Sequence, residues 1–529
     1  MKKQAIRVSA LLVSMALAQQ ALASGYHFGT QSASAQGTAN ASGAAADDAS
    51  TIFYNPAGLT HLKGTNVSGV LDLVLPSGDY TDQGSYTAAG PANLTSAYTG
   101  KTDGGKFVKA TAVPHTYFSR QINDRATFGI GVFVPFGSKT KYDENWAGRY
   151  NVIETELKTI AINPSFAFKV NDQLSIGAGV TAQFIEGKLV KGADMGTGVV
   201  ALVAPGIVAN AQKAAAGAQQ AAAAAQQAAA AGNAALAAQY AATAQQLGAT
   251  AKSLAATASG LATRLGGNPA YSGKVDVDGD DWGYGWNLGL MYDIDADTRI
   301  GLAYRSAIKH KLSGTGDWTV PQTFATDPAL VALGLGSGVQ ASLNARYADG
   351  PAALDVDTPD SVSLSVFKQI NPKVALMADF THTGHSKFQE LRIKFGNGTL
   401  KDSVTPENWG DTNKISVGGT YQYSDAVKLR AGLAYDKSPV KDSNRTPSIP
   451  DKDRKWVSLG ANIALTKESS VDLAWSFVQV GEPVVNITDN GGFANCTLAT
   501  ANSTTSCATM IGKYKVSSHV LGLQYNRGF

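Results

Sequence analysis

From residue 66 to the end of the chain, apolar residues repeatedly occupy every second position over stretches of about nine to fifteen residues. Alternation with a period of two is typical of a β-strand with one apolar face, and such stretches separated by turn residues are typical of strands that cross an outer membrane. We predict fourteen strands, at 66–75, 111–121, 126–136, 158–170, 174–190, 281–293, 298–310, 357–370, 373–381, 412–423, 426–437, 456–465, 469–480 and 515–529.

The connections between these strands alternate in length. Short turns, such as Asn123-Asp124, Asn171-Asp172 and Asn371-Pro372, contain the residues that tight turns favour. The other connections run from about twenty to ninety residues, and short turns on one side with long loops on the other are typical of outer-membrane barrels. The pattern predicts an all-β fold: a closed, 14-stranded antiparallel transmembrane β-barrel over residues 61–529.

Charged residues tell the two faces of the barrel wall apart. In the strand 298–310, Ile300, Leu302 and Ile308 share one face, whereas Arg305 and Lys309 share the other. A cation that faces lipid costs ~2–4 kcal/mol, so the arginine face must line the lumen. The same argument places Arg430 of strand 426–437 inside. We expect these three cations to bind a carboxylate, with pairing to lumen acids such as Asp436 as the alternative.

The third strand carries residues that weaken a β-ladder. Gly129 and Gly131 pack no side chain, and Pro135 has no N–H to donate. In a closed barrel this combination predicts a functional kink, a place where strand pairing is interrupted. The alternative is an ordinary proline at a strand end.

The N-terminal residues form two segments. Residues 1–23 combine a basic start, a short apolar core and the cleavage site Ala21-Leu22-Ala23, which is the pattern of an export signal peptide. Residues 24–60 consist mostly of Gly, Ala, Ser and Thr, and could not bury enough apolar surface to fold alone. Small side chains suit a segment enclosed by something else, and we predict that residues 24–60 plug the barrel.

The long connection 191–280 contains an insertion, residues 210–265, that is almost entirely Ala and Gln. These residues favour helix, and apolar residues recur every seven positions at Tyr240, Leu247, Leu254 and Leu261. Gly232-Asn233 could divide the insertion into an antiparallel helical pair. We predict a helical extracellular projection, either a variable decoration of the loop or a lid or adhesin.

Composition excludes several classes of function. The predicted signal holds three basic residues, so its removal leaves 41 Lys+Arg against 41 Asp+Glu and no charge that favours nucleic acid. No GxSxG, HExxH or P-loop motif is present, so we predict neither an enzyme nor a cofactor. His382 and His385, and the acids Asp276, Asp278, Asp280 and Asp281, are better explained as solvated loop residues than as metal ligands. Cys496 and Cys507 share one predicted loop, and in an exported chain they favour a disulfide.

Several motifs resemble those of the FadL/TodX (OmpP1) family of outer-membrane transporters of long-chain fatty acids and hydrocarbons. They are Ala46-Asp47-Asp48-Ala49-Ser50, Tyr54-Asn55-Pro56-Ala57-Gly58-Leu59, Trp146-Ala147-Gly148-Arg149-Tyr150, Asn163-Pro164-Ser165 and Gly301-Leu302-Ala303-Tyr304-Arg305-Ser306. The resemblance implies a plug, or hatch, shaped by Asn55 and Pro56. It implies that a hydrophobic ligand binds first among the extracellular loops, then in an interior pocket near Gly25, Tyr26 and Phe28, and leaves sideways at the kinked third strand.

The expected function is passive uptake of long-chain fatty acids by a monomer in the outer membrane of a Gram-negative bacterium. Uptake of aromatic or other uncharged hydrocarbons is the alternative within the same class. A surface adhesin or phage receptor is the alternative from another class, whereas a lipase lacks its nucleophile motif and the plug disfavours a general porin. Expected partners are outer-membrane lipid or lipopolysaccharide and the barrel assembly machinery, because the last strand ends in the terminal Phe529.

Overall fold

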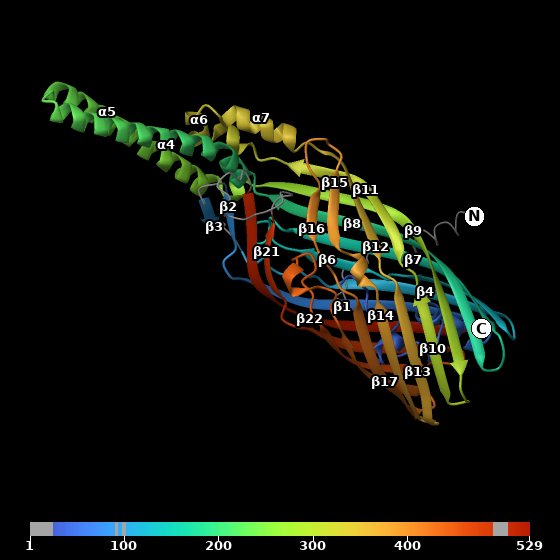
Figure 1. The fold of residues 1–529 in the computed structure, drawn as a ribbon. Coiled ribbons are helices and arrows are strands. Elements are labelled where there is room, and N and C mark those ends of the chain that lie inside the picture. The colour runs from blue at the N-terminus through green and yellow to red at the C-terminus, as the bar shows by residue number, and fades with distance from the viewer. Residues whose placement is uncertain (1–24, 90–93, 98–101, 490–505) are drawn as a thin grey trace.

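The computed structural model describes residues 25–89, 94–97, 102–489 and 506–529, and the strands within them form one antiparallel sheet. The sheet closes because the first strand, β1 (Thr65–Asp82), pairs with the last, β22 (Ser506–Gly528). This pairing runs from Asn66 opposite Gly528 to Asp82 opposite Gly512, and Figure 1 shows the resulting barrel. The predicted signal peptide and Cys496 lie outside the described residues.

The wall has fourteen strands, as predicted. Eight are continuous: β1, β4 (Thr111–Asn123), β7 (Glu154–Lys169), β8 (Leu174–Ala193), β9 (Gly273–Asp293), β18 (Val427–Asp436), β19 (Arg454–Ala464) and β22. Six consist of two segments each: β5 (Ala126–Phe133) and β6 (Gly137–Lys141), β10 (Thr298–Arg305) and β11 (Ile308–Thr319), β12 (Gly350–Thr358) and β13 (Ser361–Asn371), β14 (Val374–Thr383) and β15 (Glu390–Phe395), β16 (Ser403–Pro406) and β17 (Thr412–Ser424), and β20 (Ser469–Val480) and β21 (Val484–Asp489). A small hairpin, β2 (Tyr86–Ala89) and β3 (Leu94–Ala97), lies against β22.

The two faces of the wall follow the predicted alternation over most strands. On β18, Leu429 and Leu433 are 41% and 55% exposed on the outer face, whereas Arg430 and Asp436 are buried on the inner face. The last strand also presents its apolar residues outward, at Leu521, Leu523 and Tyr525. An apolar outer band is what a barrel wall in contact with lipid requires.

The prediction for Lys309 is wrong. The expected continuous strand 298–310 breaks after Arg305, and beyond the break Ile308 and His310 are buried while Lys309 is exposed. The reason is one extra residue on this strand: Arg305 is opposite Asn287 of β9, but Ser313 is opposite Asp280. A one-residue shift of register exchanges the two faces of a strand, so Lys309 does not line the lumen.

The plug residues described by the structure, 25–60, lie inside the barrel. They form two short helices, α2 (Ala33–Gln36) and α3 (Thr51–Tyr54), and most of the 3-10 helix η1 (Pro56–His61). Their small side chains allow close approach to glycines of the wall: a Cβ on Gly432 would lie 2.2 Å from the carbonyl carbon of Thr38, and one on Gly177 would lie 2.5 Å from the Ala57 nitrogen. Ile52 and Leu59 are completely buried against β5 and its neighbours.

The Ala-rich insertion forms two antiparallel helices that project from the long-loop end of the barrel (Figure 1). They are α4 (Met195–Ala230) and α5 (Ala234–Leu265), and Gly232, with a φ of +75°, makes the turn where Asn233 caps α5. Helix α4 begins fifteen residues before the predicted start of 210, because Met195 and Val199 pack against Leu261 and Leu265. Alone among the helices described, α4 is long and apolar enough to cross a membrane by composition, but it pairs with α5.

Shorter helices occupy the remaining loops. The base of the helical pair packs against η2 (Pro269–Tyr271), η3 (Gln322–Thr326), α6 (Pro328–Ala332) and α7 (Gly336–Arg346). Two more, η4 (His385–Lys387) and η5 (Asp442–Asn444), lie on connections nearer the barrel.

Candidate binding cavities and the plug

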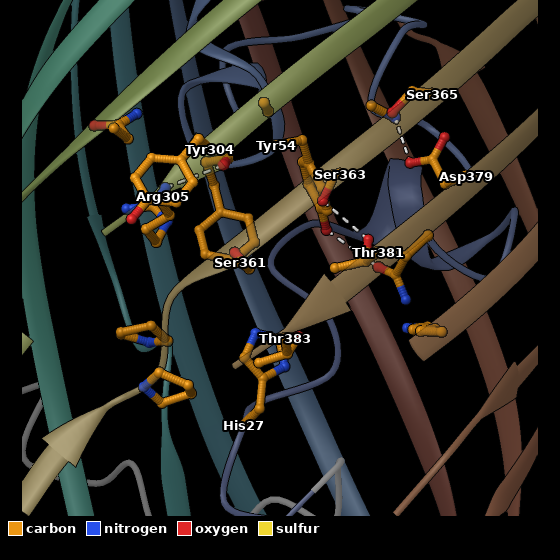
Figure 2. A pocket seen from close by; sticks show the side chains of 18 of the residues that line it. His27, Tyr54, Tyr304, Arg305, Ser361, Ser363, Ser365, Asp379, Thr381 and Thr383 are labelled. Carbon is orange, nitrogen blue, oxygen red and sulfur yellow. Dashed lines mark hydrogen bonds between the residues drawn. The ribbon is translucent and has the colours of Figure 1, made fainter. Parts of the chain in front are cut away.

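A cavity of about 100 Å³ lies inside the barrel between the plug and the wall; we call it the central cavity. Serine and threonine side chains of β13, β14 and β17 line one side, and rings of the plug and of the β5–β6 break line another (Figure 2). Its lining includes His27, Phe28, Phe53, Tyr54, Pro56, Pro135, Phe136, Arg305, Ser361, Ser363, Asp379, Thr381 and Lys414. The cavity is therefore amphipathic, with hydroxyl groups and cations beside aromatic rings.

Two cations line this cavity without a carboxylate partner. The Arg305 guanidinium donates to the carbonyl of Phe53 (3.1 Å) and lies over the rings of Phe53 and Phe133. The Lys414 ammonium lies 4.8 Å from the centre of the Trp456 ring. No carboxylate oxygen of the described residues comes within 4.0 Å of either cation. Both are half-buried, and a cation withdrawn from water without an ion pair favours an anionic ligand, since the ligand would supply the opposite charge.

The acid of the central cavity, Asp379, attracts Lys414 but forms no ion pair with it. Asp379 accepts a hydrogen bond from the Gly43 backbone of the plug (3.0 Å) and one from Ser365. His27 faces the same space, and burial, together with the positive charges of Lys414 and Arg305, lowers the pKa of His27 to about 3. Its imidazole is therefore neutral at physiological pH, and positive charge in the cavity comes from Arg305 and Lys414.

The first plug residues separate this cavity from a second one. Gly25 donates to Asp451 (3.0 Å) and has a φ of +59° beside the Trp409 ring, where only glycine fits. Tyr26 stacks on Trp409, while the next two residues line the central cavity. Beyond Tyr26 lies a mainly apolar pocket of about 110 Å³, which we call the loop-side pocket. Its lining includes Tyr26, Leu157, Leu189, Leu312, Leu354, Leu391, Ile393 and Glu407.

The interruption predicted in the third strand is present between β5 and β6, at Val134–Phe136. The plug bonds to the backbone there: the N–H of Phe28 donates to Pro135 (2.9 Å), and Gly137 donates to Tyr26 (2.8 Å). Gly129 faces the plug, because a Cβ there would lie 2.8 Å from Ile52. The break in the wall is thus covered from inside by residues 26–28.

Gly131 and the two predicted hatch residues are also in packed positions. A Cβ on Gly131 would lie 3.0 Å from the Tyr117 ring. Asn55 caps η1 by accepting from the Ala57 N–H (3.0 Å) and donates to the carbonyl of Leu290 on β9 (3.1 Å). Pro56 occupies the first position of η1, where its missing N–H costs nothing. These contacts attach the end of the plug to β9.

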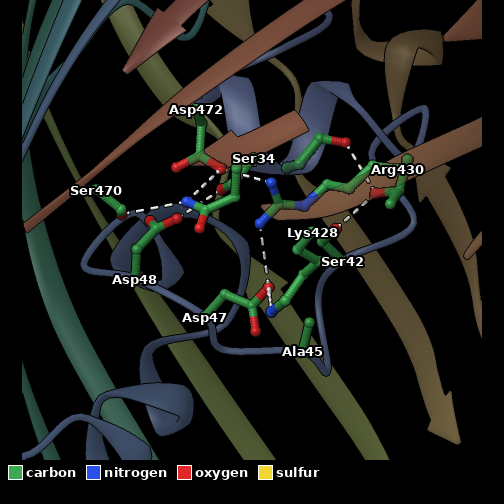
Figure 3. Close-up of polar contacts among 12 residues, drawn as sticks. Ser34, Ser42, Ala45, Asp47, Asp48, Lys428, Arg430, Ser470 and Asp472 are labelled. Carbon is green, nitrogen blue, oxygen red and sulfur yellow. Dashed lines mark hydrogen bonds and ion pairs between the residues drawn. The ribbon is translucent and has the colours of Figure 1, made fainter. Parts of the chain in front are cut away.

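Arg430 does not line either cavity. Its side chain is 3% exposed and pairs with Asp472 (2.5 Å) and with Asp47 of the plug (3.4 Å), as Figure 3 shows. Lys428 also lies 3.8 Å from Asp47, and although burial alone would raise it, the charges of Lys428 and Arg430 hold the pKa of Asp47 below its ordinary value. In the structure Arg430 therefore pairs with acids of the lumen, which is the alternative that the sequence left open. The acids are Asp47 and Asp472 and not Asp436.

A second arginine holds the same part of the plug. Arg299 of β10 donates to the carbonyls of Ala44 (3.1 Å) and Ala45 (3.2 Å), and its Nε donates to Asp293. Both Arg299 and Arg430 lie near the start of strands that follow short turns. The plug loop 44–47 is thus bound on two sides at the short-turn end of the barrel.

Sequence reasoning missed Lys414, Arg299 and Glu407. Lys414 obeys the same alternation that identified Arg430, so that rule could have found it.

The proposed solvated acids Asp276–Asp281 lie on β9, not in a loop, and Asp276 pairs with Lys188 (2.9 Å). His382 contacts Asn413, whereas His385 is buried beside Tyr26. Within the described residues, no three His, Cys, Asp or Glu side chains are grouped so that they could hold a metal ion.

Comparison with known proteins places the whole chain in one family. Residues 14–529 match the family model described as outer membrane protein transport protein (OMPP1/FadL/TodX). The outer membrane protein NMB0088 of Neisseria meningitidis serogroup B is 33% identical over 544 residues, with 100% of both chains covered. The long-chain fatty acid transport protein of Escherichia coli O6:H1 is 29% identical over 478 residues, which cover 89% of this chain and 90% of that protein.

The fold agrees with this assignment. A crystal structure of a Pseudomonas aeruginosa FadL homologue has a TM-score of 0.71 and 25% identity, and covers 96% of this chain and 100% of that one. The Ralstonia pickettii toluene transporter TbuX, at 18% identity and a TM-score of 0.53, shares the fold over 91% of this chain and 94% of its own. The chain therefore belongs to the OMPP1/FadL/TodX family of outer-membrane transport proteins, whose members carry hydrophobic compounds.

Proposed function

We propose that this protein takes up long-chain fatty acids across the outer membrane. The observation that carries the proposal is the pair of cations, Arg305 and Lys414, that face an amphipathic cavity and form no ion pair with a carboxylate of the described residues. A fatty acid supplies what the cavity lacks, a carboxylate beside aromatic and aliphatic surface. Each buried CH₂ of its tail would contribute ~0.8 kcal/mol.

The proposed route has three stages. The ligand binds first in the loop-side pocket, whose apolar walls suit an alkyl chain. It then passes Tyr26 into the central cavity, where its carboxylate meets Arg305 and Lys414. Residues 26–28 of the plug finally release the β5–β6 break, and the ligand leaves sideways into the membrane. This motion breaks the two backbone hydrogen bonds that join the plug to the break, from Phe28 to Pro135 and from Gly137 to Tyr26.

The test is uptake of a labelled long-chain fatty acid by cells that express Arg305→Ala or Lys414→Ala. Each change should lower uptake by about tenfold or more, since a charge-assisted hydrogen bond contributes ~1.5–3 kcal/mol. The matched control is Lys309→Ala, which removes a cation of the adjacent strand segment from the outer face. Uptake that is unchanged in both cavity variants would contradict the carboxylate site.

The second candidate ligand is an uncharged hydrocarbon, which the apolar lining of the loop-side pocket favours. Such a ligand needs no cation, so toluene uptake should survive Arg305→Ala and Lys414→Ala. Loss of fatty acid uptake with retention of toluene uptake would show that both compounds use the channel but only the acid uses the cations. Equal loss of both would assign the two residues a structural role instead.

A further inference from the structure

Glu407 is a buried carboxyl group in the wall of the loop-side pocket that faces no cation. The residue is 4% exposed, and no Lys, Arg or His nitrogen of the described residues lies within 4.0 Å of its oxygens. Its two oxygens accept hydrogen bonds from the indole of Trp409 (3.1 Å) and the hydroxyl of Thr446 (3.4 Å), which are neutral donors. Among the described residues, these two neutral donors are the groups that stabilise its negative charge, and no ion pair adds to them.

Another carboxyl group of the same pocket shows the contrast. Glu156 also lines the pocket, but it pairs with Lys139 (2.8 Å) and with Lys158 (2.8 Å). A carboxylate that is removed from water without a cation is costly, and burial raises the pKa of Glu407 to about 8. At neutral pH Glu407 is therefore an uncharged acid, and its O–H is a hydrogen-bond donor at the edge of an apolar space.

The charged and titratable groups around Glu407 do not favour its ionised form. These groups line the loop-side pocket, line the small cavity beside Glu407, or contact Trp409. They are Tyr26, Glu156, Asp278, Lys188, Lys191 and His385. Lys188 is engaged by Asp276, and burial, together with the positive charge of Arg454, lowers the pKa of His385 to about 3, so its ring is neutral. Glu407 is thus the carboxyl group of this pocket whose charge has no local partner.

The two compartments consequently differ in electrostatic character. Among the described residues, the loop-side pocket places a carboxyl group that forms no ion pair against apolar side chains, whereas the central cavity places two cations that form no ion pair against aromatic rings. Tyr26 lines the loop-side pocket, and the two residues after it line the central cavity. A carboxylate head group therefore meets cations in the central cavity and a carboxyl group, Glu407, in the loop-side pocket.

We propose that Glu407 sets which head groups the loop-side pocket takes. While protonated, its O–H donates to the head group of a fatty acid, a fatty alcohol or an ester, and once ionised its carboxylate repels a carboxylate head group but not an uncharged one. The central cavity takes the carboxylate in either state of Glu407. This inference rests on the proposed function, because it assumes that a fatty acid visits both compartments.

The experiment maps where a ligand binds. A long-chain acid that carries a photoreactive diazirine, and the corresponding alcohol, are cross-linked to the purified full chain at about pH 6 and about pH 9. Peptide mass spectrometry then separates labels on Leu391 and Ile393 of the loop-side pocket from labels on Phe53 and Ala303 of the central cavity. The protein variants are Glu407→Gln and, as the matched control in the same pocket, the ion-paired Glu156→Gln.

We expect the position of the cross-link to depend on the charge of Glu407. In the unchanged protein, the share of acid cross-linked in the loop-side pocket should fall by about tenfold between these pH values, which is the fall in the neutral fraction of a group with a pKa near 8. Glu407→Gln should restore much of that share at high pH, and Glu156→Gln should not. The alcohol should label the loop-side pocket equally at both values.

Two other results would overturn the inference, and they differ in what they mean for the proposed function. If the acid labels both compartments in a ratio that Glu407→Gln leaves unchanged, the head-group selectivity is wrong while fatty acid uptake stands. If neither compartment is labelled by the acid or by the alcohol, the inference and the proposed function both fail.

Discussion

At the scale of single residues, the plug depends on glycines of the wall that bring two backbones into contact. A Cβ at position 432 would lie 2.2 Å from the carbonyl carbon of Thr38, a backbone atom that cannot rotate away. Gly432→Ala should therefore lower the free energy of unfolding by about 1–3 kcal/mol, the usual cost of an overpacked site. Urea unfolding in detergent micelles measures this change in the free energy of unfolding.

The matched control is Gly69→Ala, because no atom lies within 4 Å of a Cβ built on that outward-facing glycine of β1. Its unfolding midpoint should stay close to that of the unchanged protein. If the two substitutions had the same effect, the cost at Gly432 would come from the strand itself and not from contact with the plug.

Glu407 also predicts how stability depends on pH. Its pKa is raised from 4.5 to about 8 by burial, so the folded state binds the proton more tightly than the unfolded chain does. The stability that this proton contributes is complete below about pH 4.5 and is lost as the pH rises through about 8. The loss is at most several kcal/mol, at ~1.4 kcal/mol for each pKa unit. Glu407→Gln should flatten the dependence of the unfolding midpoint on pH over this interval.

At the scale of elements, the break between β5 and β6 and the first plug residues act as a pair. His27 and Phe136 face each other in an antiparallel bridge, flanked by the bonds from Phe28 to Pro135 and from Gly137 to Tyr26. Opposed residues in such a bridge are close enough for a disulfide. In a background without Cys496 and Cys507, His27→Cys with Phe136→Cys should abolish fatty acid uptake when oxidised, and a reductant should restore it.

A second cross-link tests whether the rest of the plug must move. The hydroxyls of Thr60 and Ser175 are 2.8 Å apart and join η1 to β8. Thr60→Cys with Ser175→Cys should leave uptake unchanged in either redox state, because the proposed motion involves residues 26–28. Uptake that stops with both cross-links would mean that the plug moves as one body.

The helical pair α4–α5 makes a separate prediction. Its base packs on α6 and α7, and its tip extends away from the barrel (Figure 1). Replacing residues 200–262 by a short Gly/Ser linker should leave fatty acid uptake within about twofold of the original value, because loops tolerate such changes without loss of the scaffold. Loss of uptake with normal surface abundance would instead identify the pair as part of the ligand route.

The sequence predicts the wall better than it predicts the contacts across the lumen. Alternation placed Arg430 inside because every strand must keep charge away from lipid. The same rule failed at Lys309, since one inserted residue between Arg305 and Ser313 has no sequence signal and reverses the faces. Glu407 lies in an irregular segment where no period applies. Partners such as Arg430 and Asp47 are 383 residues apart, so only the closed barrel brings them together.

At the scale of the whole molecule, the plug is held differently at its two ends. Residues 26–28 are joined to the β5–β6 break by backbone hydrogen bonds near the cavities. The loop 44–47 is held at the short-turn end by Arg299 on one side and by Arg430 and Lys428 on the other. In the proposed route the ligand leaves sideways past residues 26–28, while the loop 44–47 stays attached and keeps the axial path closed.

Loosening the axial contacts should therefore turn the closed barrel into a leaky pore. Asp47→Asn with Arg299→Gln weakens both attachments and leaves the Arg430–Asp472 pair inside the wall intact. Each lost contact contributes ~1 kcal/mol, and every ~1.4 kcal/mol changes the open fraction tenfold, so ion conductance in planar bilayers should rise by about tenfold or more. The control Lys368→Gln removes a charge 3.7 Å from Asp295 of a short turn, and its ion conductance should equal that of the unchanged protein. Equal conductance in all three would mean that packing of small residues alone closes the axial path.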